Sequence, residues 1–221
     1  MNSTDSQRVN VVQQPFKRAM DLVLTVPAAI LLFPVLVAVA MFVRLSMGKP
    51  VLFRQLRAGR GGQPMMLLKF RTMSDAKNAA GKLLPDNERL TKFGRFLRTT
   101  SLDELPQFWN LLRGELSIVG PRPLLMEYLP LYSPEQARRL AVLPGVTSLP
   151  AIKGRNTLSW DQKFALDTWY VDHWSLGLDL RIFFVTIWCV LRREGISHPG
   201  HATMPKFSDE HLGSRCPEKT L

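Results

Sequence analysis

The stretch that organises this chain reads TSLDELPQFWNLLRGELSIVGPRP and runs from Thr100 to Pro123. Two adjacent carboxylates, Asp103 and Glu104, stand where a helix is expected to begin, and Arg122 follows in a Gly-Pro-Arg-Pro turn. Arg98 lies just upstream of the pair. One carboxylate of such a pair can attack phosphorus or hold a metal ion, while arginines neutralise phosphate oxygens. The stretch therefore indicates phosphate chemistry.

The carboxylate pair also has a purely structural interpretation, as a helix cap. Ser101 and Glu104 have the spacing of a capping box, and Asp103 would lie in the first turn, where negative charge is favoured. Pro106 would then clash at the fifth helical position, whereas Asp103 as the N-cap places it third, where its missing N–H is harmless. The local sequence by itself favours the cap over catalysis.

Composition points to an anionic partner. The chain has 221 residues, is 46% hydrophobic and has a formal net charge of +11. Residues 51–100 contain eleven Lys or Arg against three Asp or Glu, so this fifth of the chain holds most of the excess charge. Such a basic block suits nucleic acid, anionic lipid headgroups or a phosphorylated substrate. Two cysteines, with neither a disulfide framework nor metal-ligand spacing, are typical of a reducing compartment, most simply the cytoplasm.

The N-terminal part of the chain predicts a membrane segment. Residues 1–14 are expected to form a flexible tail, and residues 22–43 contain no charged side chain, which is enough to span a bilayer as a helix. Pro34 in the middle of this run predicts a break, and basic residues flank both ends. A helix–break–helix over residues 15–50 that enters and leaves one leaflet fits both features. An ordinary kinked span is the alternative, since transmembrane helices tolerate proline.

The remaining chain favours helices with a few short strands. The spacing of apolar residues predicts a helix over residues 89–99, and Ser133 begins another with a capping-box pattern. Residues 182–191 are uncharged but too few to span a bilayer, and suit either an interfacial amphipathic helix or a buried core helix. We expect a mostly α, membrane-associated domain with an N-terminal re-entrant helix and interfacial amphipathic helices.

Five blocks in a fixed order resemble the bacterial monotopic polyprenyl-phosphate phosphoglycosyl transferases of the bacterial sugar transferase family. The blocks are Lys-Phe-Arg-Thr-Met (69–73), Thr-Ser-Leu-Asp-Glu-Leu-Pro-Gln (100–107), Val-Gly-Pro-Arg-Pro (119–123), Gly-Arg-Asn (154–156) and Leu-Asp-Thr-Trp-Tyr-Val (166–171). Residues 200–207 are similar to the small members that use a UDP-linked diacetamido sugar such as diacetylbacillosamine. The family usually has Ser-Pro at the membrane break, where this chain has Phe33-Pro34.

The resemblance implies a reaction and a set of roles. Asp103 would attack the β-phosphorus of a UDP-sugar, release UMP and form a covalent aspartyl-phosphosugar, which undecaprenyl phosphate then attacks. Glu104 would bind Mg²⁺. Asp167 would orient one of the cations Lys69, Arg98 and Arg155 or a metal-bound water, although an exposed charge on an amphipathic helix is the alternative. The expected phosphate or nucleotide contacts are Lys69, Arg98, Arg122 and Arg155.

The resemblance also implies organisation and location. Residues 51–200 would form the catalytic domain, on the cytoplasmic face of a bacterial inner membrane, and residues 201–221 a C-terminal tail. Membrane lipid and other enzymes of a glycan pathway are expected partners, and nucleic acid is not. Two other functions fit parts of the sequence. A membrane-tethered basic adaptor explains the charge but not two carboxylates inside a basic region, and a hydrolase would cleave the same diphosphate.

Overall fold

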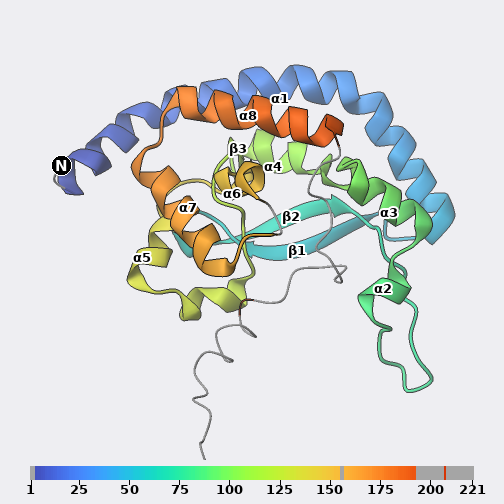
Figure 1. Ribbon diagram of the computed structural model, residues 1–221. Helices are drawn as coiled ribbons and strands as arrows, with labels where there is room; N and C mark the ends of the chain where they lie inside the picture. The colour runs from blue at the N-terminus through green and yellow to red at the C-terminus, as the bar shows by residue number, and fades with distance from the viewer. Residues whose placement is uncertain (1–2, 155–156, 193–206, 208–221) are drawn as a thin grey trace, which may run out of the picture.

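The computed structural model describes residues 3–154, 157–192 and 207, and its first element is the 45-residue helix α1 (Ser3–Met47). α1 forms an arc along one side of the molecule (Figure 1). Pro15, Pro27 and Pro34 all lie inside it, so the break that we expected at Pro34 does not interrupt the helix. A proline bends a helix but removes only one backbone hydrogen bond, and the residues on both sides of Pro34 keep theirs.

The beginning of α1 differs from our expectation as well. The helix starts at Ser3 and so includes most of residues 1–14, for which we expected a flexible tail. Extending an existing helix fixes one residue for each bond gained, which is far easier than starting one. Within the described residues, Pro15–Met47 is the one helical stretch that is long and apolar enough to cross a membrane, judged by length and composition.

Two small sheets lie beneath α1. β1 (Leu52–Ala58) and β2 (Pro64–Phe70) form an antiparallel hairpin in which Leu52 pairs with Phe70. Its turn has Gly61 and Gly62 at φ 64° and 74°, a left-handed conformation that glycine adopts without strain. β3 (Ser117–Val119) and β4 (Gly145–Thr147) form a short parallel pair.

Short helices fill the rest of the described chain, so the expectation of a mostly α protein with few short strands is confirmed. They are α2 (Asp86–Arg89), α3 (Lys92–Thr99), η2 (Leu102–Glu104), α4 (Gln107–Arg113), η3 (Met126–Leu131), α5 (Pro134–Ala137), η4 (Arg138–Ala141), α6 (Leu149–Lys153), α7 (Trp160–Asp172) and α8 (Leu176–Arg192), with η1 (Arg60–Gly62) in the hairpin turn. The predicted capping box at Ser133 is confirmed at the start of α5.

Within the described residues the hydrophobic core has three clusters; α1 contributes buried residues to one of them and packs Leu24 against another. Val39 and Val43 of α1 pack with Phe70 and Leu97. The main cluster joins β2, β3, α4, α7 and α8, and a third is aromatic and contains Phe207. Burying each aliphatic side chain contributes about 1.5–3 kcal/mol, so α1 is bound to the domain at its C-terminal end.

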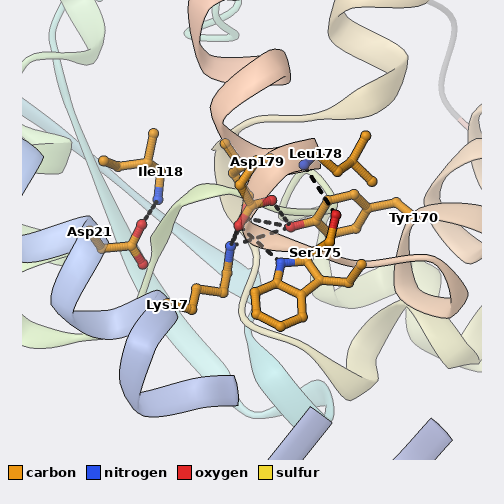
Figure 2. Close-up of polar contacts among 9 residues, drawn as sticks. Lys17, Asp21, Ile118, Tyr170, Ser175, Leu178 and Asp179 are labelled. Carbon is orange, nitrogen blue, oxygen red and sulfur yellow. Dashed lines mark hydrogen bonds and ion pairs between the residues drawn. The ribbon is translucent and has the colours of Figure 1, made fainter. Parts of the chain in front are cut away.

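The N-terminal part of α1 is held by a buried polar cluster, which we call the Lys17 cluster: Lys17, Tyr170, Trp174 and Asp179. Figure 2 shows Lys17 pointing toward Asp179 of α8 and Tyr170 of α7. Lys17 forms an ion pair with Asp179 and donates to the carbonyl of Val119 at 2.9 Å. Tyr170 Oη and Trp174 Nε1 donate to Asp179 at 2.6 and 2.9 Å. Each charge therefore has several partners, which is what a buried ion pair requires.

Two further residues of α1, Arg18 and Asp21, form hydrogen bonds to α4 and β3. Arg18 donates to the carbonyls of Leu111 and Leu112 at 2.5 and 2.7 Å, at the C-terminal end of α4, where a cation is favoured. Asp21 accepts from the backbone N–H of Ile118 at 3.1 Å (Figure 2). Both ends of the apolar part of α1 are therefore attached to the same domain.

α8 combines the two alternatives that its sequence allowed. Asp179 and Ile182 are fully buried, whereas Leu180, Phe184 and Trp188 are exposed. One face thus belongs to the core and the opposite face is an exposed apolar surface, as in an interfacial helix.

Candidate functional site

Asp103 and Glu104 lie in the short 3₁₀ turn η2, between α3 and α4. Ser101 precedes them with φ 56° and makes no side-chain cap, and α4 begins only at Gln107, with Pro106 before it. Both capping interpretations of the pair are therefore wrong. The chain makes a separate 3₁₀ turn at the pair, and Pro106 is the N-cap residue of α4. The carboxylates remain available for other contacts.

Glu104 is bound by two cations from different parts of the chain. Lys69 Nζ at the end of β2 lies 2.6 Å from Glu104 Oε1, and Arg122 Nη2 lies 3.1 Å from the same oxygen. Burial raises the pKa of Glu104, but the charges of Lys69 and Arg122 outweigh it and lower the pKa to about 2. Glu104 is therefore ionised throughout the physiological range.

Asp103 has the opposite character although it is the adjacent residue. It is only 8% exposed. Burial and the negative charge of Glu104 raise its pKa to about 6, against the opposing effect of Lys69, Arg98 and Arg122. A pair of neighbouring carboxylates whose pKa values are driven apart is the arrangement that assigns them different chemical roles. At neutral pH Asp103 is largely ionised, yet its charge is poorly stabilised, which suits a nucleophile.

Arg122 is positioned by a rigid turn that follows β3. A Cβ on Gly145 would lie 2.1 Å from the backbone nitrogen of Gly120, so the two backbones approach as closely as only glycine allows. Arg139 donates to the carbonyl of Arg122 at 2.7 Å. Asp167 in turn binds Arg139 through hydrogen bonds of 2.7 and 3.0 Å. Asp167 and Arg139 thus hold the backbone at the arginine of the Gly-Pro-Arg-Pro turn.

The structure decides whether Asp167 is an exposed or a buried charge. Its side chain is 5% exposed, so the alternative of an exposed charge is wrong. Within the described residues, the cation that it binds is Arg139, which the sequence interpretation missed, and not Lys69 or Arg98, two of the three cations that we expected. No local pattern distinguishes Arg139 from Arg138 beside it; only the packing of α7 against η4 brings it to Asp167.

The other predicted contacts have different outcomes. Arg98 of α3 donates to Thr72 Oγ1 at 3.1 Å, and its charge acts on Asp103. Arg155 lies outside the described residues. Arg57, which was not among the predicted site residues, lines a pocket beside the site; the sequence signals for it were its place in the basic block and beside the glycine turn at residues 59–62. The lining residues are Arg57, Leu67, Lys69, Gln107, Arg122, Pro123, Gly145 and Val146.

Glu104 is the residue that we expected to hold a metal ion. Within the described residues, no group of three or more His, Cys, Asp or Glu could hold a metal ion. Glu104 could contribute to binding only an ion that takes its other oxygens from water or from a ligand, which is how Mg²⁺ commonly binds at phosphate-transfer sites.

Comparison with known proteins identifies the family of this chain. The profile described as "Bacterial sugar transferase" matches residues 12–193. The uncharacterized sugar transferase EpsL of Bacillus subtilis (strain 168) is 51% identical over 197 residues, which cover 87% of this chain and 95% of EpsL. The UDP-glucose:undecaprenyl-phosphate glucose-1-phosphate transferase of Klebsiella pneumoniae is 38% identical over 194 residues, 81% of this chain and 41% of the relative.

A third relative has the same identity and coverage as the Klebsiella protein. The UDP-galactose-lipid carrier transferase of Erwinia amylovora is 38% identical over 196 residues, 81% of this chain and 41% of the relative. The chain thus spans about two fifths of the length of the Klebsiella and Erwinia relatives and nearly all of EpsL. The profile match covers most of the chain and includes every predicted site residue from Lys69 to Asp167. The chain therefore belongs to the bacterial sugar transferase family.

Proposed function

We propose that this protein transfers a sugar-1-phosphate from a UDP-sugar to undecaprenyl phosphate, with release of UMP. The observation that carries the proposal is the Asp103–Glu104 pair, in which one carboxylate has a pKa of about 6 and its neighbour a pKa of about 2 beside Lys69 and Arg122. The names of the Klebsiella and Erwinia relatives support the donor and acceptor classes.

Two successive displacements use these groups. The ionised carboxylate of Asp103 attacks the β-phosphorus of the UDP-sugar, the bond to the bridging oxygen breaks, and UMP leaves with the electron pair. An oxygen of undecaprenyl phosphate then attacks the same phosphorus and restores the free carboxylate. Lys69 and Arg122 stabilise the charge that develops on the phosphate oxygens in both steps. Mg²⁺, held by Glu104, would supply additional charge neutralisation at the diphosphate.

The identity of the sugar is the finer part of the proposal. The resemblance of residues 200–207 favours a UDP-diacetamido sugar such as UDP-diacetylbacillosamine, and a UDP-N-acetylhexosamine is the next choice. The Klebsiella and Erwinia relatives are named for glucose and galactose. All four classes therefore belong in a substrate panel. The product would be the first membrane-bound intermediate of a glycoconjugate.

The proposed location is the cytoplasmic face of the inner membrane, with α1 entering and leaving one leaflet as a single curved helix that its prolines bend without breaking. Lys17 and Val43, near the two ends of the apolar segment, are both buried against the same domain. That attachment supports an arrangement in which both ends remain on one side of the bilayer. Single cysteines at Ser3 and Ser74, with Cys189 and Cys216 replaced, should both be protected from a periplasmic reagent; labelling of Ser3 alone would indicate a full span.

The test of the reaction is UMP release by the purified full chain with a panel of UDP-sugars. Release should require undecaprenyl phosphate for turnover, and it should respond to the Mg²⁺ concentration. Without the acceptor, rapid quenching should find one sugar-phosphate mass on the peptide that contains Asp103. Sustained UMP release without the acceptor would indicate a hydrolase. Acceptor-dependent release without any adduct would indicate direct transfer in a ternary complex.

A further inference from the structure

Arg57 is a half-buried cation that lies beside Arg122. β1, which contains Arg57, pairs at its end with the segment that follows the Gly-Pro-Arg-Pro turn: Ala58 donates to the carbonyl of Leu124 at 2.9 Å. Arg57 itself lies within hydrogen-bond distance of the Pro123 carbonyl, at 3.4 Å. The strand pairing therefore fixes Arg57 next to the turn that holds Arg122.

The contacts of Arg57 include no carboxylate, although the charge of Glu127 acts on it from beyond ion-pair distance. Its Nε and Nη2 donate to Gln55 Oε1 at 3.0 and 2.5 Å, and both Gln55 and the Pro123 carbonyl are neutral acceptors. Among the ion pairs of the described residues, none includes Arg57. A guanidinium that is partly removed from water and paired only with neutral groups is suited to an anionic ligand.

The pocket beside the dyad contains three cations. Arg57, Lys69 and Arg122 all line it, together with Gln107, whose amide can also donate. Lys69 and Arg122 share a single carboxylate oxygen of Glu104. Burial, and next the charge of Arg122, lower the pKa of Arg57 to about 10. The two guanidiniums thus disfavour each other, and an anion between them would relieve that repulsion.

We propose that Arg57 and Arg122 together bind a phosphate group of the substrate in this pocket. Arg57 is then a substrate-binding residue that supplements Lys69 and Arg122, and its assignment to substrate rests on the proposed function. Phosphate is present in both substrates, as the diphosphate of the UDP-sugar and as the headgroup of undecaprenyl phosphate. The chemistry of the pocket is the same for both sources.

The test measures ligand binding and does not depend on turnover. Inorganic diphosphate, UMP and undecaprenyl phosphate are each titrated into the full chain in detergent, with the thermal unfolding midpoint as the readout. Arg57→Gln should weaken diphosphate binding roughly tenfold, and Arg57→Lys less, because lysine keeps the charge but loses the two-pronged contact. The matched control is Arg54→Gln, an exposed arginine on the opposite face of β1, which should leave binding unchanged.

The probes also distinguish the source of the phosphate. If the pocket binds the donor, Arg57→Gln weakens the binding of UMP and leaves the binding of undecaprenyl phosphate unchanged. If the pocket binds the acceptor, Arg57→Gln weakens the binding of undecaprenyl phosphate and leaves that of UMP unchanged. Equal binding of all three probes by wild type and Arg57→Gln, or no protection of wild type by diphosphate, overturns the proposal. Should Arg57→Gln not fold, the comparison of Arg57→Lys with Arg54→Lys decides the same question. Diphosphate binding through Arg57 without UMP release from any UDP-sugar would refute the proposed function and its substrate assignment, and would leave Arg57 as a phosphate-binding residue.

Discussion

The Lys17 cluster and the Asp103–Glu104 pair both combine carboxylates with cations, but they differ in how completely the charges are paired. Asp179 is fully buried and accepts from Lys17, Tyr170 and Trp174, so its charge has several close partners. Asp103 is nearly as buried, yet none of the ion pairs of the described residues includes it. Complete pairing yields a structural contact, and incomplete pairing leaves a carboxylate available for reaction.

The contrast predicts that the same replacement, acid to amide, has opposite consequences at the two places. At Asp103 the amide removes a poorly stabilised charge, so the stability of the folded state should not decrease. At Asp179 the amide removes the charged partner of a buried lysine, so the stability of the folded state should decrease, although the Asp103–Glu104 pair is unchanged. Four measurements test this contrast.

The largest expected effect is on activity, for Asp103→Asn. Turnover should fall by roughly a thousandfold or more, because an amide cannot replace the carboxylate nucleophile. The unfolding midpoint should stay equal or rise, because a pKa raised to about 6 means that the ionised side chain destabilises the fold at neutral pH. Asp161→Asn, an exposed acid on α7, is the control and should keep its activity. Retention of more than about a tenth of the wild-type rate would leave Asp103 without a covalent role.

The second effect is on stability, for Asp179→Asn. Loss of one partner of a buried ion pair costs about 3–5 kcal/mol, which for a chain of this size lowers the unfolding midpoint on the order of 10 °C. The double variant Lys17→Met with Asp179→Asn should recover part of the loss, because the unpaired lysine is gone. The activity of the folded fraction should change little. A midpoint within about 2 °C of wild type would show that the cluster contributes no net stability.

The third effect is the pH dependence of kcat/KM. Attack requires ionised Asp103, so kcat/KM should fall below pH 6 and approach a tenfold loss per pH unit, while Glu104, with its pKa of about 2, stays ionised. Protonation of Asp103 removes a destabilising charge, so its titration should raise the unfolding midpoint as pH falls from 7 to 5. The contribution of Glu104 has the opposite sign and is lost only below about pH 4.5. An acid limb near pH 4 would contradict the raised pKa of Asp103.

The smallest expected effect is the loss of stability when an exposed ion pair is broken, and it tests whether burial determines how much an ion pair contributes. Arg138 and Asp172 form an ion pair on the surface, with side chains 49% and 34% exposed. Arg138→Gln should cost less than about 1 kcal/mol, or less than about 3 °C in the unfolding midpoint. A loss as large as that of Asp179→Asn would mean that the contact itself, and not its burial, determines the contribution.

Much of this molecule could be predicted from segments that carry their own signal. The apolar run of α1, the helix predicted over residues 89–99 and the capping box at Ser133 are local patterns, and all three are helical, although α3 begins only at Lys92. Lys69, Glu104 and Arg122, which the sequence placed in separate blocks of one site, do meet through contacts of 2.6 and 3.1 Å. The break at Pro34 was wrong because α1 continues through the proline with the loss of one backbone hydrogen bond, and the caps were wrong because the pair lies in a separate 3₁₀ turn before α4.

The sequence by itself determined the charged groups, the membrane-type helix and the order of the blocks, because these depend on residue type and spacing along the chain. Only the tertiary structure decided which charges are paired. Arg139 meets Asp167, Arg57 meets the Arg122 turn, and Lys17 meets Asp179 across long stretches of sequence. A pKa depends on burial and on charges within a few ångströms. Neither quantity exists until the chain has folded, so the division between Asp103 and Glu104 could only follow from the fold.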